Sequence, residues 1–513
     1  MNSLPHPPTW GRASRFGAAV RGRPRWRSGN GSTELNRVVV GPFNRVEGDL
    51  EVSLDFEGGR VAAAYVNSPL FRGFEQILIG REPMDALAIV PRICGICSVS
   101  QSAAAAAALA DLAGVRPTPN GQRVSNLILA AENLADHFTH FYLFFMPDFA
   151  RDAYRGRPWF DAAATRFKAT TGSATADALP ARAAFLQIMG SLAGKWPHSM
   201  TLQPGGVARA PQTAERLRVF AALREFRAWL ERRLFGDRLE AIAGIDSVAA
   251  LRRWMDARPA TASDFRLFLA IADDLQLARI GRATDRFLSH GAYPKDAGWL
   301  FPRGVLDLPA GALQPFEPAD VVEDVSHAWL EADVPRHPSE GDTRPVEHKD
   351  GAYTWCKAPR WQGQVAECGA LARQVVAGHP LIRELVMEHG GNVASRVIAR
   401  LLELALVVPA MEQWLKALDD GPFCAQTMLP TDGRGCGLVE AARGALGHWL
   451  TVRGGHIVRY QIIAPTTWNF SPRDAAGTPG ALEQALVGLP EAEPLLVQHV
   501  VRSFDPCMVC TVH

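Results

Sequence analysis

The sequence contains no apolar run long enough to cross a bilayer, and its N-terminus has no apolar stretch of the kind found in signal peptides. It has almost no net charge: 54 basic and 53 acidic residues leave +1, which excludes a general electrostatic attraction to nucleic acid or anionic membranes. Cysteine is scarce, with eight residues in 513, so a disulfide framework is not expected. These absences predict a cytoplasmic protein in a reducing compartment, with no membrane span and no nucleic-acid partner.

The chain also lacks internal repeats, and its low-complexity sequence is confined to the alanine run 103–108. A hydrophobic content of 47% is ample for a large buried core. Residues 1–33 carry six arginines and no acidic residue, which predicts a disordered N-terminal extension. A transit peptide shares this composition but would show an amphipathic apolar stripe. Residues 34–513 are expected to form a single domain.

Periodicity predicts a mainly α fold of the α+β class: a large irregular helical domain with a small N-terminal antiparallel β element. Residues 36–66 alternate apolar and polar side chains, and Glu57-Gly58-Gly59 marks a hairpin turn. Helical patterns are found at 100–113, 124–145, 210–290, 394–418 and 481–501. Residues 296–350 are rich in Pro, Asp and Glu and are expected to form loops with short strands.

Two Cys-x-x-Cys pairs lie near opposite ends of the chain, Cys94 and Cys97 in RICGIC and Cys507 and Cys510 in DPCMVC. Thiolates are soft ligands, so four of them would bind zinc, iron or nickel in preference to magnesium. Cys97 precedes a predicted helix, whose dipole and free N–H groups would stabilise a thiolate. Zinc ribbons place their pairs about 15–20 residues apart, whereas Cys507 follows Cys97 by 410 positions. Spacing alone leaves a structural zinc site and a redox metal equally open.

The surrounding motifs distinguish between these metals. RICGIC, SFDPCMVCTVH, GPFNRVEGDL, PLFRGFE, EAARGALGHW and APTTWNFSPRD together resemble the large subunit of nickel–iron hydrogenases, over residues 36–513. The resemblance implies the fold of that family and the cleavage of H2 into a proton and a hydride. It also implies that Cys94 and Cys507 bind nickel terminally, while Cys97 and Cys510 bridge nickel to an iron that carries CO and two cyanide ligands.

The same resemblance implies roles for residues outside the thiol pairs. Glu47 matches the family's proton-transfer glutamate, although a lone Glu at the end of a strand is ordinarily a solvated charge. Arg443 matches the arginine that the family holds above the metals, and Asp136 and Asp505 match the carboxylates that orient it. A structural ion-pair network is the alternative for these three residues. Ala442 stands where a proline is usual, and we expect no effect of this difference on catalysis.

A buried Mg2+ near the C-terminus is also implied. Glu75 and His513 match its ligands, together with the backbone carbonyl of Ile462, and oxygen ligands suit this hard cation. The alternative for a C-terminal His is a frayed chain end. Residues expected to have supporting or structural roles are Lys357, Arg360, His198, His137 and His140.

Several departures from the commonest pattern resemble the regulatory, hydrogen-sensing branch of the family. The chain ends at His513 where most catalytic members continue, and Gln101 stands where they have a His, which changes a hydrogen bond beside the metals. Ile96 and Phe144 match positions along the hydrophobic gas path where smaller side chains are common; bulkier ones would restrict O2 more than H2. Ordinary core packing is the alternative for both. Asp136, His140 and Phe144 follow one another at intervals of four residues, which predicts a shared helical face directed at the active site.

The leading hypothesis is a sensor that binds and slowly oxidises H2 and passes electrons to a small subunit, which alone would hold iron–sulfur clusters. The two subunits would form a heterodimer, with a dimer of heterodimers as a further option, and would signal to a histidine kinase. An uptake hydrogenase that feeds electrons from H2 to respiration is the alternative. A metal-free subunit like that of respiratory complex I would lack these thiols, so we rank it last.

Overall fold

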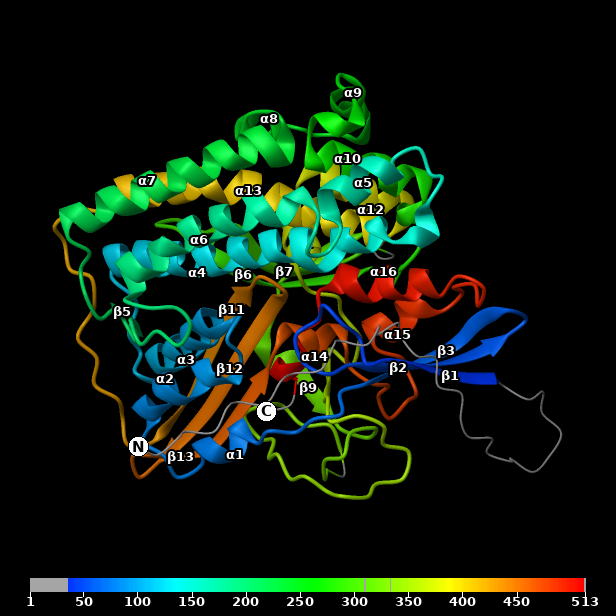
Figure 1. The fold of residues 1–513 in the computed structure, drawn as a ribbon. Coiled ribbons are helices and arrows are strands. Elements are labelled where there is room, and N and C mark those ends of the chain that lie inside the picture. Colours follow the sequence, from blue (N-terminus) through cyan, green and yellow to red (C-terminus); the bar gives the residue numbers. More distant parts are fainter. Residues whose placement is uncertain (1–35, 309–310, 333, 512–513) are drawn as a thin grey trace, which may run out of the picture.

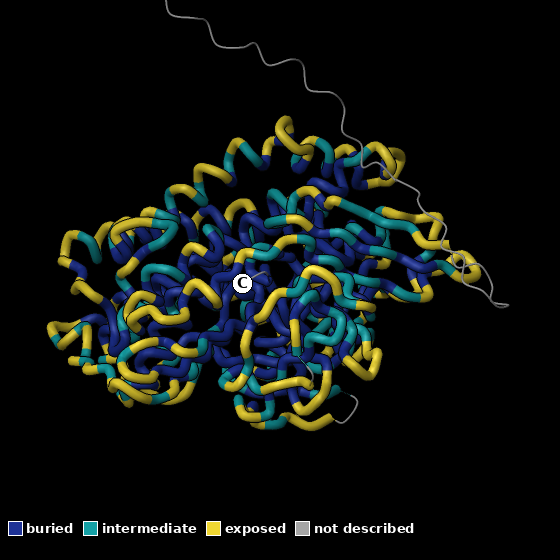
Figure 2. The backbone as a smooth tube through the Cα atoms, turned by 90° about the horizontal axis from the view of Figure 1, so that it is seen from below, coloured by how far each residue is buried: buried dark blue, intermediate teal, exposed yellow. Residues whose placement is uncertain are grey.

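The computed structural model describes residues 36–308, 311–332 and 334–511, so the extension predicted at 1–33 and the predicted ligand His513 lie outside the described residues. Figure 1 shows a layer of long helices above a region of shorter helices and small sheets, with the N-terminal strands projecting to one side. Buried backbone fills the interior and exposed backbone forms the periphery (Figure 2). The predicted mainly α fold with a small N-terminal β element is confirmed.

The N-terminal sheet is antiparallel and consists of β1 (Asn36–Val40), β2 (Glu51–Glu57) and β3 (Arg60–Asn67). Glu57 pairs with Arg60 across the predicted turn, where Gly58 and Gly59 both have positive φ. The turn therefore needs the two glycines at these positions, because other residues rarely adopt this backbone conformation.

The helical layer is built from α4 (Pro119–Thr139), α6 (Ser173–Ala193), α7 (Thr213–Trp229) and α13 (Val393–Lys416). Helix α4 begins after Thr118, whose side chain accepts a hydrogen bond from Gly121 N, and carries a proline at its first position. Helix α4 then widens into a π-helical segment, η3 (His140–Phe145). Helix α13 packs against α4 and α7 and is buried on nearly every side over its first four turns, so it has no continuous polar face.

A second antiparallel sheet, β11 (Gly433–Ala441), β12 (Gly444–Arg453) and β13 (His456–Ile463), supports helix α3 (Ser98–Leu112). A Cβ atom on Gly435 would lie 2.1 Å from Ala108 O, and one on Gly437 would lie 2.0 Å from Ala104 O. The alanine run of α3 and the glycines of β11 therefore fit together at a distance that larger side chains would prevent. This contact holds the middle of α3 beside the sheet.

The shorter helices are α1 (Phe74–Leu78), α2 (Ala86–Ile89), α5 (Phe160–Phe167), α8 (Leu239–Ala243), α9 (Val248–Asp256), α10 (Asp264–Asp274), α11 (Ala370–Ala377), α12 (Pro380–His389), α14 (Pro465–Asn469), α15 (Ala481–Leu486) and α16 (Pro494–Phe504). The other strands are β4 (Leu202–Gln203), β5 (Gly206–Val207), β6 (Arg286–Pro294), β7 (Trp299–Asp307), β8 (Ala312–Gln314), β9 (Val321–Asp324) and β10 (Ala358–Trp361). Strand β6 replaces the end of the helical region predicted to reach residue 290. Within the described ranges, no helix combines the length and the apolarity that a membrane crossing needs.

Candidate metal centre

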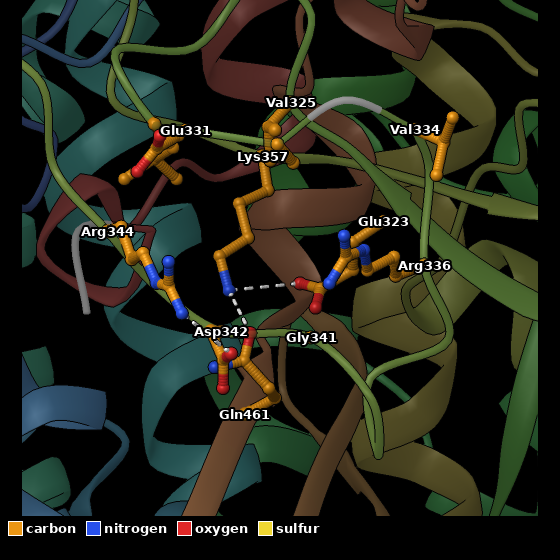
Figure 3. Close-up of a pocket in the computed structure, with 12 residues that line it drawn as sticks. Glu323, Val325, Glu331, Val334, Arg336, Gly341, Asp342, Arg344, Lys357 and Gln461 are labelled. Carbon is orange, nitrogen blue, oxygen red and sulfur yellow. Dashed lines mark hydrogen bonds and ion pairs between the residues drawn. The ribbon is translucent and has the colours of Figure 1, made fainter.

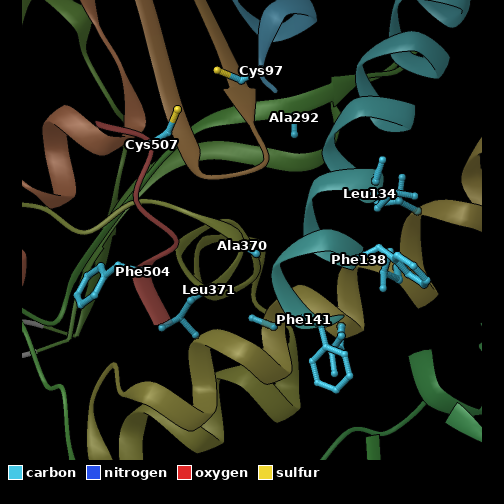
Figure 4. Packing of buried hydrophobic residues seen from close by; sticks show 14 of the residues in the cluster. Cys97, Leu134, Phe138, Phe141, Ala292, Ala370, Leu371, Phe504 and Cys507 are labelled. Carbon is cyan, nitrogen blue, oxygen red and sulfur yellow. The ribbon is translucent and has the colours of Figure 1, made fainter. Parts of the chain in front are cut away.

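Four thiols meet in the interior, where the two ends of the domain come together. Cys94 Sγ lies 3.4 Å from Cys507 Sγ, and Cys510 Sγ lies 3.1 Å from both Cys97 Sγ and Cys507 Sγ. All four sulfur atoms fall within 4.8 Å of one another, and all four residues are buried. Figure 4 shows Cys97 and Cys507 facing each other across the site. The two pairs therefore form one four-thiol site.

The first pair lies between a 3₁₀ turn and helix α3. Cys94 follows the turn η2 (Val90–Ile93), whose last carbonyls accept hydrogen bonds from Arg72: Nη1 donates to Ile93 O at 2.5 Å and Nη2 to Arg92 O at 3.1 Å. Cys97 directly precedes α3, as predicted. Arg72 therefore fixes the backbone on the N-terminal side of the pair, and the helix fixes it on the other.

The N–H groups at the start of α3 are not free, contrary to the prediction that they would stabilise the Cys97 thiolate. Val99 N and Ser100 N each donate a hydrogen bond of 2.8 Å to the carboxylate of Glu132 in α4, and Trp196 Nε1 donates another at 3.0 Å. Burial raises the pKa of Glu132 to about 7. The helix terminus binds this carboxylate instead of a thiol, which ties α4 to the end of α3 that carries Cys97.

The second pair is held by a backbone seam between Glu47 and the segment 506–508, which we call the Glu47 seam. Met508 N donates to Glu47 O at 2.7 Å, Glu47 N donates to Pro506 O at 3.4 Å, and Glu47 forms a parallel bridge with Cys507. Gly48, with φ of +81°, allows this approach, because a Cβ there would lie 2.9 Å from Val509 N. The seam places Glu47 beside the thiols.

A buried carboxylate anchors both sides of the seam. Asp148 is fully buried and accepts hydrogen bonds from Arg45, two residues before Glu47, and from Arg502 Nη1 at 2.5 Å in α16. Arg502 Nη2 also donates to Asn44 Oδ1 at 2.8 Å. Although burial opposes ionisation, His499, Arg502 and Arg45 hold the pKa of Asp148 well below its ordinary value. This cluster links the segment before Glu47 to the helix that leads into Cys507.

The electrostatics of the four thiols fit a soft cation. Hydrogen bonds from Cys507 and the other thiols lower the pKa of Cys94 well below its ordinary value, whereas hydrogen bonding with Cys507 and burial raise the pKa of Cys97. Ionising one thiol therefore opposes the ionisation of its neighbours, and the positive charge of Arg443, which interacts with Cys97 and Cys507, is already shared with two carboxylates. A bound transition metal would supply further positive charge, and its ligands are soft sulfur atoms.

Arg443 lies between two carboxylates next to the thiols. Its Nη1 donates to Asp136 Oδ2 at 2.5 Å, and its Nη2 donates to Asp505 Oδ1 at 3.1 Å. All three side chains are buried. Burial raises the pKa of Asp136 to about 8, whereas Arg443 outweighs burial and lowers the pKa of Asp505. One cation thus serves two acids, and the guanidinium is held in a single orientation by both.

The Glu47 side chain is half-buried, between the thiols and the protein surface. Burial, together with the negative charge of Cys94, raises the pKa of Glu47, and the cations Arg443 and Arg72 partly offset this shift. The raised pKa means that Glu47 binds a proton more readily than an exposed glutamate does.

Gln101 has a polar side chain that approaches Cys510, one of the two predicted bridging thiols. Its Nε2 lies 4.0 Å from Cys510 Sγ, and it is almost fully buried. Ile96 and Phe144 are both half-buried. The predicted face that joins Asp136, His140 and Phe144 is wrong at Phe144, because the π turns of η3 replace the α-helical spacing from residue 140 onward.

The predicted Mg2+ ligands Glu75 and Ile462 lie next to each other, since Ile462 N donates to Glu75 Oε1 at 2.8 Å. Lys357 Nζ is 2.9 Å from Glu75 Oε2 and also pairs with Glu323 at 3.4 Å. Figure 3 shows the Lys357 ammonium directed at Glu323 and Gln461. These three residues are among those that line a cavity of about 250 Å3. The third predicted ligand, His513, lies outside the described residues.

The remaining predicted residues have structural contacts. His137 pairs with Glu403, His140 Nε2 lies 2.7 Å from Arg502 O, and His198 Nδ1 lies 2.9 Å from Pro91 O. Arg360 Nε donates to Asp474 at 2.9 Å. Sequence reasoning missed Glu132, Asp148, Arg72 and Thr466, whose hydroxyl accepts from Cys507 N at 3.1 Å. Motif position could have indicated Arg72 and Thr466, which lie inside RGFE and APTTWN, but nothing in the sequence marks Glu132 or Asp148.

A buried four-thiol site that joins the two ends of a mainly helical domain, with an acid and a buried arginine beside it, has the features of a metal-binding protein. The sequence pattern of the nickel-dependent hydrogenase family matches residues 72–153 and 173–513, and the chain belongs to this family. It is therefore the large subunit of a hydrogenase of the nickel–iron type.

Individual relatives agree over nearly the whole length. The periplasmic [NiFeSe] hydrogenase large subunit of Desulfomicrobium baculatum is 30% identical, over 93% of this chain and 95% of its own. The hydrogenase-2 large chain of Escherichia coli K12 is 27% identical, over 93% and 97%. The solved Ni-Fe-Se hydrogenase from D. vulgaris Hildenborough superposes with a TM-score of 0.80 at 28% identity, over 93% and 99%.

Proposed function

We propose that this large subunit belongs to a regulatory hydrogenase, which binds and slowly oxidises H2 in order to report its presence. The observation that carries the proposal is Gln101, a neutral amide directed at Cys510, where the resembled catalytic pattern has a His. An amide cannot gain a positive charge, so it tunes the thiolate without exchanging protons with it.

The four thiols would hold the metals: Cys94 and Cys507 nickel, and Cys97 and Cys510 both nickel and an iron with CO and two cyanide ligands. When bound, this pair supplies the Lewis acid and the electron acceptor for H2 cleavage. Glu47 would take up the proton on its half-buried carboxylate and pass it toward solvent. Arg443, held by Asp136 and Asp505, would direct a fixed positive charge at the reacting H2.

Two bulky side chains support a low turnover and a restricted gas supply. Ile96 lies between the two first-pair thiols in the sequence, and Phe144 lies in the π-helical segment, where wider turns change the direction of the side chain. Ile96 and Phe144 stand where smaller side chains are common in the resembled family. They would narrow the path to the thiols, which would hinder O2 more than the smaller H2. The proposal gives Glu75, the Ile462 carbonyl and His513 the role of Mg2+ ligands near the C-terminal segment.

The electrons need a partner subunit. Among the residues that the structure describes, the four cysteines form the single His, Cys, Asp and Glu group close enough to hold a metal. We therefore assign the iron–sulfur relay to a small subunit, in a heterodimer or a pair of heterodimers, and the signal to a histidine kinase. A cytoplasmic location is part of this proposal, whereas one relative is named periplasmic. A relative from Rubrivivax gelatinosus is named an uptake hydrogenase large subunit, which favours the alternative, an uptake hydrogenase that supplies respiration.

Infrared spectroscopy of the purified heterodimer under H2, with a nickel count, tests the centre. We expect CO and cyanide bands in nickel-replete protein, and their absence from active protein would rule out the nickel–iron assignment. Deletion of the gene tests the sensing role. If the cell's other hydrogenase genes still respond to H2 in the deletion strain, the protein is not the sensor; loss of growth on H2 would support the uptake alternative.

A further inference from the structure

A row of buried polar side chains leads from Cys510 into the sheet β11–β13. Gln101 in α3 lies next to the thiol, and its Oε1 is 2.8 Å from His448 Nε2 in β12. His448 Nδ1 is 2.8 Å from the Tyr460 hydroxyl in β13. Gln101 and Tyr460 are each 1% exposed, and His448 is 0% exposed. We call these three residues the amide relay.

The hydrogen bonds of the relay decide which end of the Gln101 amide faces the thiol. A proton on His448 Nε2 can be donated only to an oxygen, so it places Oε1 toward His448 and the NH2 group toward Cys510. A neutral ring protonated on Nδ1 alone would reverse the amide and bring its carbonyl oxygen against the sulfur. Two groups that carry lone pairs would then face each other, without a donor between them, in a buried site.

Tyr460 supplies a donor for the first of these two arrangements. A phenol holds its proton at neutral pH, so the Tyr460 hydroxyl can donate to Nδ1 of the neutral ring. An Nδ1 that accepts a hydrogen bond leaves the ring proton on Nε2. The rings of His448 and Tyr460 also pack edge to face, with centroids 5.6 Å apart and planes at 78°, and both residues lie on paired strands. The donor and the ring therefore keep a constant mutual geometry.

We propose that His448 and Tyr460 are positioning residues that fix the Gln101 amide with its NH2 group toward Cys510 Sγ. The inference rests on the proposed nickel–iron centre, in which Cys510 is a bridging ligand. A donor directed at the sulfur withdraws electron density from it, so the thiolate donates less to the metals. Through Gln101, His448 thereby sets how much electron density the Cys510 thiolate donates to the metals.

The packing of α3 keeps the relay in register. Gly435 and Gly437 of β11 let the alanine face of α3 approach the sheet closely, which fixes the distance between Gln101 and His448. Positioning groups on a helix and two strands are held more precisely than groups on loops. A role in core packing alone would be served equally well by either orientation of the amide, so the two explanations differ in their consequences for the centre.

Infrared spectra of the nickel-replete heterodimer, recorded in one redox state, test the inference. Gln101→Leu removes the donor and should move the CO stretch to lower wavenumber. His448→Phe keeps a ring of similar size, releases the amide, and should move the band in the same direction by a smaller amount. In the Gln101→Leu background, His448→Phe should produce no additional shift. Tyr293→Phe, which removes a buried hydroxyl bonded to Asn133, is the control and should leave the band in place.

Every other outcome either supports or contradicts the role of His448 and Tyr460 in positioning the amide. An unmoved band in His448→Phe, or an equal shift with and without Gln101, would show that His448 does not act through the amide. If His448→Phe does not fold, Tyr460→Phe decides: a shifted or divided band supports the relay, and a single unmoved band overturns it. Wild-type protein without CO and cyanide bands would overturn the proposed nickel–iron centre. The proposed effect of the relay on that centre would then be overturned as well.

Discussion

Replacing Arg443 with lysine separates its structural contribution from a contribution to catalysis. The guanidinium donates four hydrogen bonds: one to Asp505 O at 2.9 Å, one to the Asp505 carboxylate, and two to Asp136. Lysine keeps the positive charge that the two buried acids require. It lacks the planar fork, however, and its single nitrogen cannot reach all four acceptors.

The expected loss of stability follows from these contacts. If lysine retains two of the four hydrogen bonds, the protein loses two charge-assisted bonds, and relaxation leaves a cost of about 3 kcal/mol. Unfolding entropy is about 2 cal/mol/K per residue, or about 1 kcal/mol/K for a chain of this length. The melting temperature of Arg443→Lys should therefore fall by about 3 °C.

Arg373 provides a matched control within the same chain. It is fully buried and pairs with two carboxylates, Glu440 at 2.7 Å and Glu403 at 2.9 Å, but it has no predicted role in the centre. Arg373→Lys should lower the melting temperature by a similar amount. The rate of H/D exchange per bound nickel should then differ: a fall of about 100-fold in Arg443→Lys, typical of losing one preorganised charge at a reacting group, and no change in Arg373→Lys.

The result that would refute this reasoning is equal H/D exchange in the two variants after correction for nickel. An unchanged rate in both would reduce Arg443 to an ion-pair residue. A similar fall in both would show that global destabilisation, and not the position of the guanidinium, limits exchange. Scanning calorimetry and mass spectrometry of the exchanged gas give the two quantities on the same samples.

Three further predictions concern the Glu47 seam and its anchor. Glu47→Gln should retain nickel but slow H/D exchange sharply, because an amide cannot carry the proton; an undiminished rate would remove Glu47 from the proton path. Gly48→Ala should lose about 2 kcal/mol of stability and much of the bound nickel, because the new Cβ would lie against Val509 N. Gly59→Ala is the control: this glycine also has positive φ but no atom lies near its Cβ position, so the variant should keep its nickel. The cations around Asp148 lower its pKa in the folded protein. The stability that the ionised carboxylate contributes is therefore complete above the unfolded pKa of about 4, and it is lost as the pH falls below that value. The difference in melting temperature between wild type and Asp148→Asn should therefore be constant from pH 5 to 7 and shrink toward pH 3, and a constant difference at all pH values would contradict the assignment.

The parts of the site that could be predicted from the sequence are those encoded in short motifs. The thiol pairs are recognisable from their residue type and spacing, whereas Glu47 and Arg443 are recognisable only through the resemblance of the motifs that contain them. The N-terminal hairpin is also local, since two glycines define its turn. The helix at 393–416 is visible as an apolar stretch, although burial on nearly all sides removes the polar face that periodicity needs.

The parts that could not be predicted depend on long-range packing. Strand β11 is rich in glycine, a composition typical of loops. It forms a strand because its glycines allow the alanine face of α3 to pack against it. The π turns of η3 interrupt a pattern that appears continuous in the sequence. Glu132 and Asp148 gain their roles only from partners far along the chain, and the free helix terminus predicted at Cys97 is wrong because such a partner occupies it.

The Glu47 seam also determines when the centre can exist during folding. Cys94 and Cys507 are separated by 413 positions, and closing a flexible loop of that length costs about 5 kcal/mol. A nascent chain cannot complete the four-thiol set until its last cysteine has left the ribosome, so the helical layer has time to fold and shorten the remaining gap first. The four-thiol site is thus completed late in folding. Docking of the segment 506–510 is the step that would enclose a metal already bound to the first thiol pair.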